Sequence, residues 1–422
     1  MKKVLTILVL LICFVGIQTA EAQHDPDLKY RKFRVTLVPG LSTNGLDAHE
    51  YSAKYSLNIL VGYHGALDGY EIGIVNINKK YAEGLQLGVL NATGGNMAGL
   101  NLASLVNYAR EDMQGLQFAG LGNISEGYVQ GFQFAGLINT GLQGIQGLQF
   151  AGIANIGGGD IQGIQGAGIL NAGTGDMQGI MMSGIGNFST AYAQGIMMSG
   201  VLNVANDMQG ISMAGILNVA SEMQGIQIAG VANVAKRAEG VQIGLVNIGD
   251  YFDGVPVGLV SLYGNGRKNV DIWVNDGGYT NFGLKLGTMD IYNMISLGYN
   301  SALNGEDLWS FGWSIGAHTP LEEAWNNDRY RGYFRMKDFT IQSIQEEDDD
   351  IWESSMYSFR YMLGKEITRG FGIYAGPTLN LLVSDEEDEK DYTWYSIIDT
   401  DRGDHNFKLW LGFTAGLQFF GN

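Results

Sequence analysis

The sequence predicts an all-β protein in which a repeat-built parallel β-solenoid is combined with an antiparallel β-barrel of the outer-membrane type. Three observations carry this prediction. A glycine-rich phrase with a period of 14 to 16 residues recurs thirteen times between residues 66 and 263. Longer segments outside the repeats alternate apolar with polar residues, as strands with two different faces do. Glycine makes up 63 of the 422 residues and proline only 5, which favours strands and turns over disorder.

The first 22 residues read as a secretory signal peptide. Lys2 and Lys3 precede an apolar run at residues 4–17, and Ala20-Glu21-Ala22 has the small-residue pattern of a cleavage site. A membrane anchor is the alternative, but the run is too short to span a bilayer. Cys13, the single cysteine, lies inside this run. We therefore expect an exported mature chain without disulfides or thiolate chemistry.

Charge and motif content limit the partners. The formal net charge is −18, which argues against nucleic acid as a partner. Glycine-rich stretches such as Gly157-Gly158-Gly159 precede no GKS or GKT, so no phosphate-binding loop is indicated. No cofactor is expected. The expected partners are outer-membrane lipid and an unidentified surface or periplasmic ligand.

The repeats share a glycine near their start and an asparagine near their end. The glycines are Gly69, Gly84, Gly99, Gly115, Gly131, Gly147, Gly163, Gly179, Gly195, Gly210, Gly225, Gly240 and Gly254. The asparagines are Asn76, Asn91, Asn107, Asn123, Asn139, Asn155, Asn171, Asn187, Asn203, Asn218, Asn233 and Asn247, and Ser261 takes the thirteenth place. Self-similarity at a fixed period indicates one structural unit stacked on itself.

Each repeat contains one alternating segment. In GLQLGVLN, residues 84–91, Leu85, Leu87 and Val89 alternate with Gln86 and Gly88. This is the pattern of a strand with one buried face, and we expect the apolar residues to form that face. Each coil would then bury its apolar face against its neighbours, while the strand glutamines would lie outward. The asparagine is expected to be a buried turn amide that the next asparagine satisfies.

Two methionine pairs extend this expectation. Met181-Met182 and Met197-Met198 occupy equivalent positions on adjacent repeats. The second methionine of each pair is predicted to lie in the core and the first to point outward. An outward methionine pair could form a small adaptable binding patch, or it could simply fill space between glutamines.

The recurring asparagine predicts a column of amides. Identical amides stacked at the strand spacing can hydrogen-bond along the column, as in cross-β structures. Glutamines recur in the same way at two positions, one before the glycine (Gln114, Gln130, Gln146, Gln162, Gln178 and Gln194) and one on the strand (Gln86, Gln117, Gln133, Gln149 and Gln165).

A large antiparallel barrel is the alternative architecture for the repeats, with each repeat as one membrane strand. Successive turns would then lie on opposite sides of the membrane, so odd and even linkers should differ. Instead, the same linker pattern occurs at residues 112–115, 160–163, 176–179 and 207–210 without an odd–even rule. The linkers favour the parallel stack.

Ten segments are predicted to be barrel strands. All seven tryptophans lie at or after Trp273, which marks a second domain at residues 264–422, and residues 23–65 are predicted to hold the first barrel-like strands. The strands are expected at 33–41, 55–63, 268–274, 281–287, 291–299, 308–317, 330–344, 355–363, 370–382 and 406–420. A soluble β-sandwich is the alternative, but an aromatic-rich final strand is typical of outer-membrane barrels.

The loops of this barrel would alternate between the two sides of the membrane. If both ends are periplasmic, the acidic loops at 346–350 and 385–389 face outward, and the short turns at 288–290 and 364–369 face the periplasm. The repeats, inserted after the second strand, would then emerge on the periplasmic side or plug the lumen.

The phrase GLQFAGLIN at 131–139 and its variants resemble a family of Gram-negative surface-repeat proteins. VPGLSTNG at 38–45 and SLNILVGYHGALDGYEIGIVNI at 56–77 belong to the same resemblance, which covers about residues 33–262. The resemblance implies exposure in the cell envelope. It carries over no catalytic residues, because the family has no established activity.

No enzyme chemistry is predicted. The five histidines are scattered without metal-ligand spacing. Asp112, Asp160, Asp176, Asp207 and Glu222 share one repeat position and could form a calcium column, but turn residues bonding their own backbone fit the pattern better. The leading expectation is a non-enzymatic envelope protein with a structural or binding role. The alternative is a large outer-membrane pore.

Overall fold

The computed structural model describes residues 25–301, 308–326, 331–346, 354–385, 395–402 and 405–420. It contains a parallel β-solenoid and a closed antiparallel barrel of eight strands. The chain divides into two compact units, Met1–Ala220 and Ser221–Asn422. This division lies within the repeats. The change from parallel to antiparallel pairing comes later, between residues 263 and 267, next to the boundary expected from composition.

The solenoid strands follow one another along the chain. They are β1 (Lys29–Val38), β2 (Leu41–Ser42), β3 (Tyr51–Thr93), β4 (Met97–Ala109), β5 (Met113–Ala119), β6 (Gly122–Ser125), β7 (Tyr128–Ala135), β8 (Ile138–Gly141), β9 (Gly144–Ala151), β10 (Ala154–Gly157), β11 (Asp160–Ala167), β12 (Leu170–Gly173), β13 (Met177–Ser183), β14 (Gly186–Ser199), β15 (Leu202–Ala214), β16 (Leu217–Ala229), β17 (Ala232–Ile243), β18 (Val246–Val257) and β19 (Val260–Tyr263).

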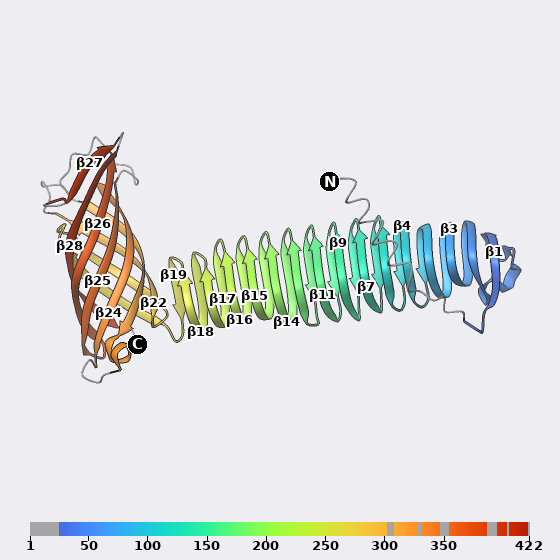
Figure 1. The fold of residues 1–422 in the computed structure, drawn as a ribbon, viewed down its shortest axis with the longest axis horizontal. Helices are drawn as coiled ribbons and strands as arrows, with labels where there is room; N and C mark the ends of the chain where they lie inside the picture. Colours follow the sequence, from blue (N-terminus) through green and yellow to red (C-terminus); the bar gives the residue numbers. More distant parts are fainter. Residues whose placement is uncertain are drawn as a thin grey trace. The chain divides into compact units, whose positions relative to one another are not determined.

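Equivalent repeat positions pair in parallel register. On β11, Gly163 pairs with Gly147 of β9 and Gly179 of β13. On β10, Asn155 pairs with Asn139 of β8 and with Asn171 of β12. The strands of successive coils therefore run in the same direction, as their arrows show (Figure 1). Parallel pairing excludes the alternative in which the repeats are strands of an antiparallel membrane barrel.

The repeat glycine marks a place where only glycine fits. Gly147 has φ +141°, and a Cβ atom there would lie 2.0 Å from the carbonyl oxygen of Gly131 on the coil before it. Gly131 and Gly163 have the same positive φ and the same close backbone contact. Each coil bends at this glycine and stacks directly on the glycine before it.

The side chains of the alternating strand point in the opposite sense to the prediction. Gln86 and Gln117 are buried, whereas Leu85 and Leu87 lie at the partly exposed outer surface. The repeat asparagines are buried, as predicted. The methionine pairs are reversed as well. Met181 and Met197, predicted to point outward, are fully buried, while Met182 and Met198 are partly exposed. The interior of the stack thus holds amide columns together with a buried apolar column that includes Met113, Val129, Ile145 and Ile161. Leucine, isoleucine and phenylalanine cover much of its outside.

The two segments at 33–41 and 55–63 are not barrel strands. β1 pairs in parallel with β3, with Phe33 opposite Tyr55 and Val35 opposite Leu57. Both segments therefore belong to the first coils of the solenoid. Their alternating pattern resembles that of the barrel strands because both structures place apolar residues outward. The barrel has eight strands rather than ten, and the repeats precede it instead of interrupting it.

The barrel strands are β20 (Arg267–Asn275), β21 (Thr280–Gly287), β22 (Ile291–Asn300), β23 (Leu308–Pro320), β24 (Tyr333–Glu346), β25 (Ser354–Thr368), β26 (Phe371–Asp385) and β28 (His405–Phe420). Neighbours pair antiparallel in chain order, and β28 closes the barrel on β20, with Val274 opposite Ala415. A further short strand, β27 (Ile398–Arg402), pairs with the start of β28. These eight strands match the last eight predicted segments to within a few residues.

Helices are short in the described part of the chain. They are the 3-10 helix η1 (Gly45–Glu50) and the α-helix α2 (Leu321–Trp325). None of the helices in the described ranges has the length and apolar character that a membrane-spanning helix requires.

Candidate functional site

The repeat asparagines form hydrogen-bonded columns inside the stack. From Asn76 to Asn203, each Asn Nδ2 donates to the Oδ1 of the asparagine on the next coil, as from Asn123 to Asn139 at 2.9 Å and from Asn139 to Asn155 at 2.9 Å. The same Nδ2 also donates to a backbone oxygen, from Asn139 to Phe150 at 2.9 Å. All twelve asparagine side chains are at most 1% exposed. Their amides therefore find partners without water.

The strand glutamines form a second column with the opposite direction. Gln149 Nε2 donates to Gln133 Oε1 at 2.6 Å, and Gln133 Nε2 donates to Gln117 Oε1 at 2.8 Å. These donors point toward the N-terminal coils, whereas the asparagine donors point toward the C-terminal coils. Because the two amide columns run antiparallel, their dipoles partly cancel in the water-free interior.

The asparagine column meets a buried ion pair in the first coils. Arg34 Nη2 donates to Glu71 Oε1 at 3.2 Å, and neither side chain is exposed to solvent. Glu71 also accepts hydrogen bonds from Ser56, Asn58, Asn78 and Gln86. The carboxylate thus accepts several amide and hydroxyl donors, which favour its charged form. The column from Gln165 to Gln117 does not reach it, because Gln117 Nε2 donates to Met97 Sδ.

His64 completes this cluster. Its Nε2 lies 2.9 Å from Asn58 Oδ1 and 3.5 Å from Thr36 Oγ1, while Nδ1 has no hydrogen-bond partner. Burial, and then the charge of Arg34, lower the pKa of His64 to about 3. Burial alone would raise the pKa of Glu71, but the Arg34 charge and the hydrogen bonds to this carboxylate outweigh burial and lower it. At neutral pH the cluster therefore holds a neutral imidazole beside a charged Arg–Glu pair.

We expect the N-terminal coils to lose stability as the pH falls. Between pH 6.5 and about 3, the unfolded chain protonates His64 while the folded chain does not, so up to about 1.4 kcal/mol is lost per pH unit. Glu71 adds a loss below pH 4.5, since its folded pKa is depressed. Hydrogen exchange of β1 and β3 amides at pH 7.5, 5.5 and 4 measures this. His64→Gln should remove the loss between pH 7.5 and 5.5, and an unchanged loss in this variant would contradict the assignment.

A second charged cluster fills the barrel interior. Arg360 makes two hydrogen bonds to Asp338, at 2.6 and 2.9 Å, and Tyr292 donates to the same carboxylate at 2.7 Å. Lys285 Nζ lies 2.5 Å from Asp271 Oδ2 and 4.5 Å from the centre of the Tyr292 ring. All these side chains are buried, so each charge is paired within the barrel.

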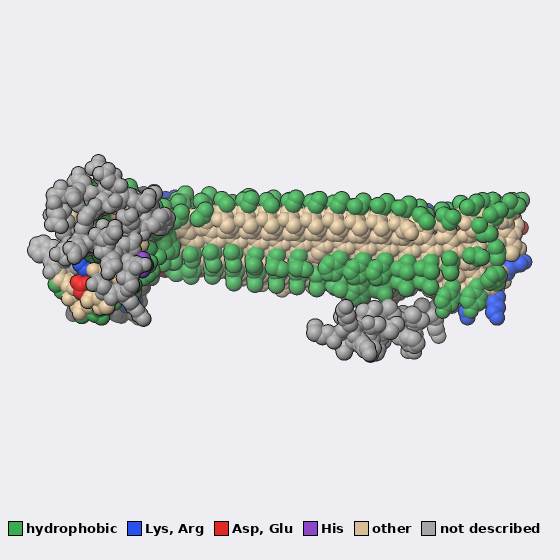
Figure 2. All heavy atoms as spheres, turned by 90° about the horizontal axis from the view of Figure 1, so that it is seen from above, with side chains coloured by type: hydrophobic (Ala, Val, Ile, Leu, Met, Phe, Trp, Pro, Cys, Tyr) green, Lys and Arg blue, Asp and Glu red, His purple; other side chains and the backbone are tan. Residues whose placement is uncertain are grey.

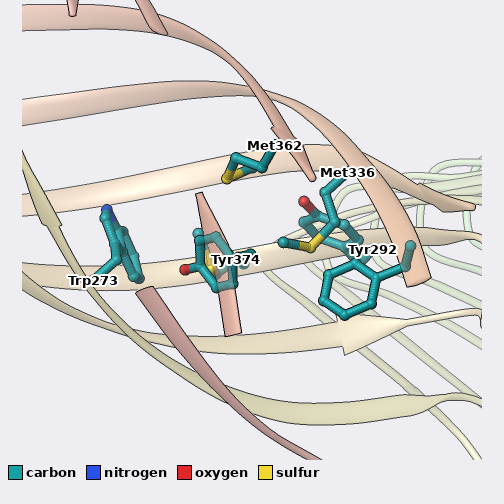
Figure 3. Packing of buried hydrophobic residues seen from close by; sticks show 7 residues of the cluster. Trp273, Tyr292, Met336, Met362 and Tyr374 are labelled. Carbon is teal, nitrogen blue, oxygen red and sulfur yellow. The ribbon is translucent and has the colours of Figure 1, made fainter. Parts of the chain in front are cut away.

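Bulky side chains pack beside these ion pairs. Trp273, Tyr292, Met336, Met362 and Tyr374 lie together inside the barrel wall (Figure 3). The interior that the described strands enclose is therefore packed with side chains at this level. Eight strands are the size at which side chains can fill a barrel.

The last coil is bonded to the barrel within the second unit. Asn247 Nδ2 and Asn293 Nδ2 both donate to Ser261 Oγ, at 3.3 and 3.2 Å. Asn293, on β22, also donates to the carbonyl of Pro256, and Trp313 Nε1 donates to the carbonyl of Gly258 at 2.8 Å. A barrel amide therefore joins the amide column where the repeat changes from asparagine to serine.

The acidic repeat position does not form a metal site. Asp160 Oδ1 accepts the backbone N–H of Asp176 at 3.0 Å, and Asp112 Oδ1 accepts that of Tyr128 at 2.9 Å. The prediction that these aspartates bond the backbone of their own turn is therefore wrong for Asp112 and Asp160, which bond the backbone of the next coil. Within the described ranges, no three His, Cys, Asp or Glu side chains gather closely enough to hold a metal ion. The acidic loop residues 347–350 and 386–389 lie outside the described residues.

The comparisons with known proteins give no family for this chain. No protein-family model, curated protein or solved structure matches it.

Sequence reasoning missed both charged clusters. Arg34 and Glu71 occupy inward positions of alternating segments, where a charge needs a buried partner. Lys285 and Asp338 interrupt the barrel strands in the same way. The signal was present as a charge within an alternating strand, but pairing the charges requires the fold.

Proposed function

We propose that this protein is a non-enzymatic cell-envelope protein whose barrel inserts in the outer membrane and holds the solenoid in a structural or binding role. The observation that carries the proposal is the inverted barrel. Its outward side chains, such as Trp309, Phe311 and Phe413, are large, apolar and exposed. Its inward side chains include the paired charges of Asp271 and Lys285. Apolar side chains outside and polar side chains inside are the distribution expected of a barrel that is surrounded by lipid.

The dimensions support the same proposal. A membrane strand needs about 9–11 residues, and β22, β23 and β24 have 10, 13 and 14 residues. The predicted signal peptide would supply export, and the surface-repeat resemblance is consistent with an envelope location. The packed interior favours an anchor over an open pore. The repeats join the barrel at the end that carries the turn at 288–290 and the end of β28. If that end is periplasmic, the repeats leave the barrel on the periplasmic side.

The test is to place a charge on the outer face of the barrel. Phe311→Lys puts an ammonium where lipid is expected, at a cost of roughly 2–4 kcal/mol near the bilayer midplane. Met289→Lys, in the exposed turn between β21 and β22, is the matched control. We expect the wild type and Met289→Lys to sediment with outer membranes, to resist urea extraction and to show heat-modifiable mobility. Phe311→Lys should lose most of its folded, membrane-inserted fraction.

Two outcomes would overturn this function. One is recovery of the folded wild-type protein in the soluble fraction. The other is equal insertion of both lysine variants, because a lipid-facing position cannot tolerate a charge as a turn does.

A further inference from the structure

The outside of the solenoid is unusually apolar for a protein surface in water. One outward position of each coil, the Leu121 column, consists of Leu121, Leu137, Ile153, Ile169, Ile185 and Val201. These side chains are 37% to 51% exposed, although each is partly covered by the column members above and below it. Further apolar residues occupy three other outward positions, represented by Leu116, Phe118 and Ile124. Apolar rows that continue over this many coils mark a site of interaction.

Charge is confined to one edge of the coil. Between Met113 and Ala220 the chain has no lysine or arginine, and its acidic residues are Glu126, Asp160, Asp176 and Asp207. These residues lie next to the outward glutamine column that includes Gln130, and together they form a polar edge. The remaining outward positions are apolar, so each coil is amphipathic around its circumference. Figure 2 shows hydrophobic side chains in separate rows along the coils.

The backbone under the apolar surface is saturated with hydrogen bonds. At the corner that carries the Leu121 column, Leu137 N–H donates to the carbonyl of Leu121 at 3.0 Å, and Ile153 N–H donates to that of Leu137 at 2.9 Å. Asparagine amides pair along one column, and the amides from Gln117 to Gln165 pair along another. A surface that contacts hydrocarbon must satisfy its backbone internally, and the backbone at this corner does so. The buried hydroxyls of Thr140, Ser183 and Ser199 have no hydrogen-bond partner.

A carbohydrate ligand does not fit the aromatic part of this surface. The rings of Phe118 and Phe134 stack at 5.0 Å and 7°, and those of Phe134 and Phe150 at 5.6 Å and 12°. The ring faces between these three side chains cover one another, and a sugar needs an open face. The groove beside them, about 630 Å³, is lined by Leu87, Leu102, Ala103, Ser104 and neighbouring apolar residues without a charged group.

A second copy of the chain would cover only one row of this surface. The apolar rows lie on more than one side of the coils, and hydrocarbon can cover all of them at once. We infer that the solenoid lies along a lipid bilayer, with its apolar surface in the acyl-chain boundary and its polar edge toward water. This inference rests on the proposed membrane location of the barrel. The exposed charges of Lys29, Arg31 and Lys32 on the first coil keep that end at the headgroups, so the stack lies along the bilayer instead of crossing it.

The experiment uses three variants of the full chain in which Cys13 is replaced by serine, so that each carries one introduced cysteine. Leu137→Cys reports on the apolar surface, and Gln130→Cys, in the same coil, reports on the polar edge. Leu297→Cys reports on the outer face of the barrel. Each variant is labelled with the environment-sensitive dye NBD and reconstituted in phosphatidylcholine vesicles with or without brominated acyl chains. Heat-modifiable mobility confirms that each labelled barrel is folded.

We expect brominated chains to quench the labels at Leu137 and Leu297 several-fold more strongly than the label at Gln130. Quenching at Leu297 but at neither repeat position would overturn this inference and leave the barrel proposal intact. No quenching at Leu297 would overturn the proposed function itself. A Leu137 label that is shielded from water but not quenched, together with cross-linking between copies, would assign the surface to a second copy and overturn the lipid inference. Equal quenching at Leu137 and Gln130 would overturn the amphipathic orientation.

Discussion

Replacing Gly147 by alanine is expected to disrupt the stacking of the solenoid coils. The new Cβ would lie 2.0 Å from the carbonyl oxygen of Gly131, at a φ of +141° that an alanine rarely adopts. A backbone atom cannot move aside as a side chain can, so the two coils must separate. The strain and the clash together should cost more than about 4 kcal/mol. Hydrogen exchange should show lost protection in β7, β9 and β11.

Gly166→Ala is the matched control for this change. Gly166 lies on β11 at a position where the neighbouring coils carry Phe150 and Met182, and its φ is not in the left-handed region. Its new Cβ would meet only the ring of Phe150, at 2.7 Å, and that side chain can rotate. We expect a small effect. Equal loss of protection in both variants would show that the positive φ and backbone contact of Gly147 are not the cause.

Removing the Asp338 carboxylate is expected to have a similarly large effect on the barrel. Asp338→Ala leaves the guanidinium of Arg360 buried without its two hydrogen bonds and removes the acceptor of Tyr292 Oη. Breaking one side of a buried ion pair costs about 3–5 kcal/mol. The midpoint of urea unfolding of the protein in vesicles, read as the loss of heat-modifiable mobility, measures the change.

The double variant Asp338→Ala/Arg360→Met separates an unpaired charge from lost packing. Because the buried charge is then absent, we expect the double variant to be more stable than Asp338→Ala alone. The Arg360 guanidinium also lies 4.8 Å from the centre of the Trp273 ring, so some stability should remain lost with it. A double variant less stable than either single variant would contradict the ion-pair account.

The strands themselves were largely predictable from sequence. Barrel segments such as 281–287 and 291–299 alternate so regularly that their bounds agree with β21 and β22 to within a residue. The repeat period, the parallel stack and the register of the asparagines were also predictable, because identical units can pair equivalently only in a parallel stack. The local pattern is sufficient to predict the pairing of the coils, because each residue lies beside the equivalent residues of the neighbouring repeats.

The direction of the side chains was not predictable in the same way. The alternation of Leu85, Gln86 and Leu87 indicates that the two faces of the strand differ, but it does not indicate which face lies inside the coil. In the folded coil the inward residues stack on their equivalents, where amides can hydrogen-bond along the column. The general preference for buried apolar residues therefore failed here. Met181 takes the inward position of Gln165 on the next coil, and Met182 therefore lies outward.

By itself the sequence determined an all-β chain, the period of its coils, the columns of identical residues and the last eight barrel strands. Only the tertiary structure decided that Phe33 and Tyr55 join the solenoid, that the strand glutamines lie inside it, and that Arg34 meets Glu71. The physical reason is that alternation is a local property of one strand. Which strand lies beside it, and what fills the space between its coils, depends on contacts between residues far apart in the chain.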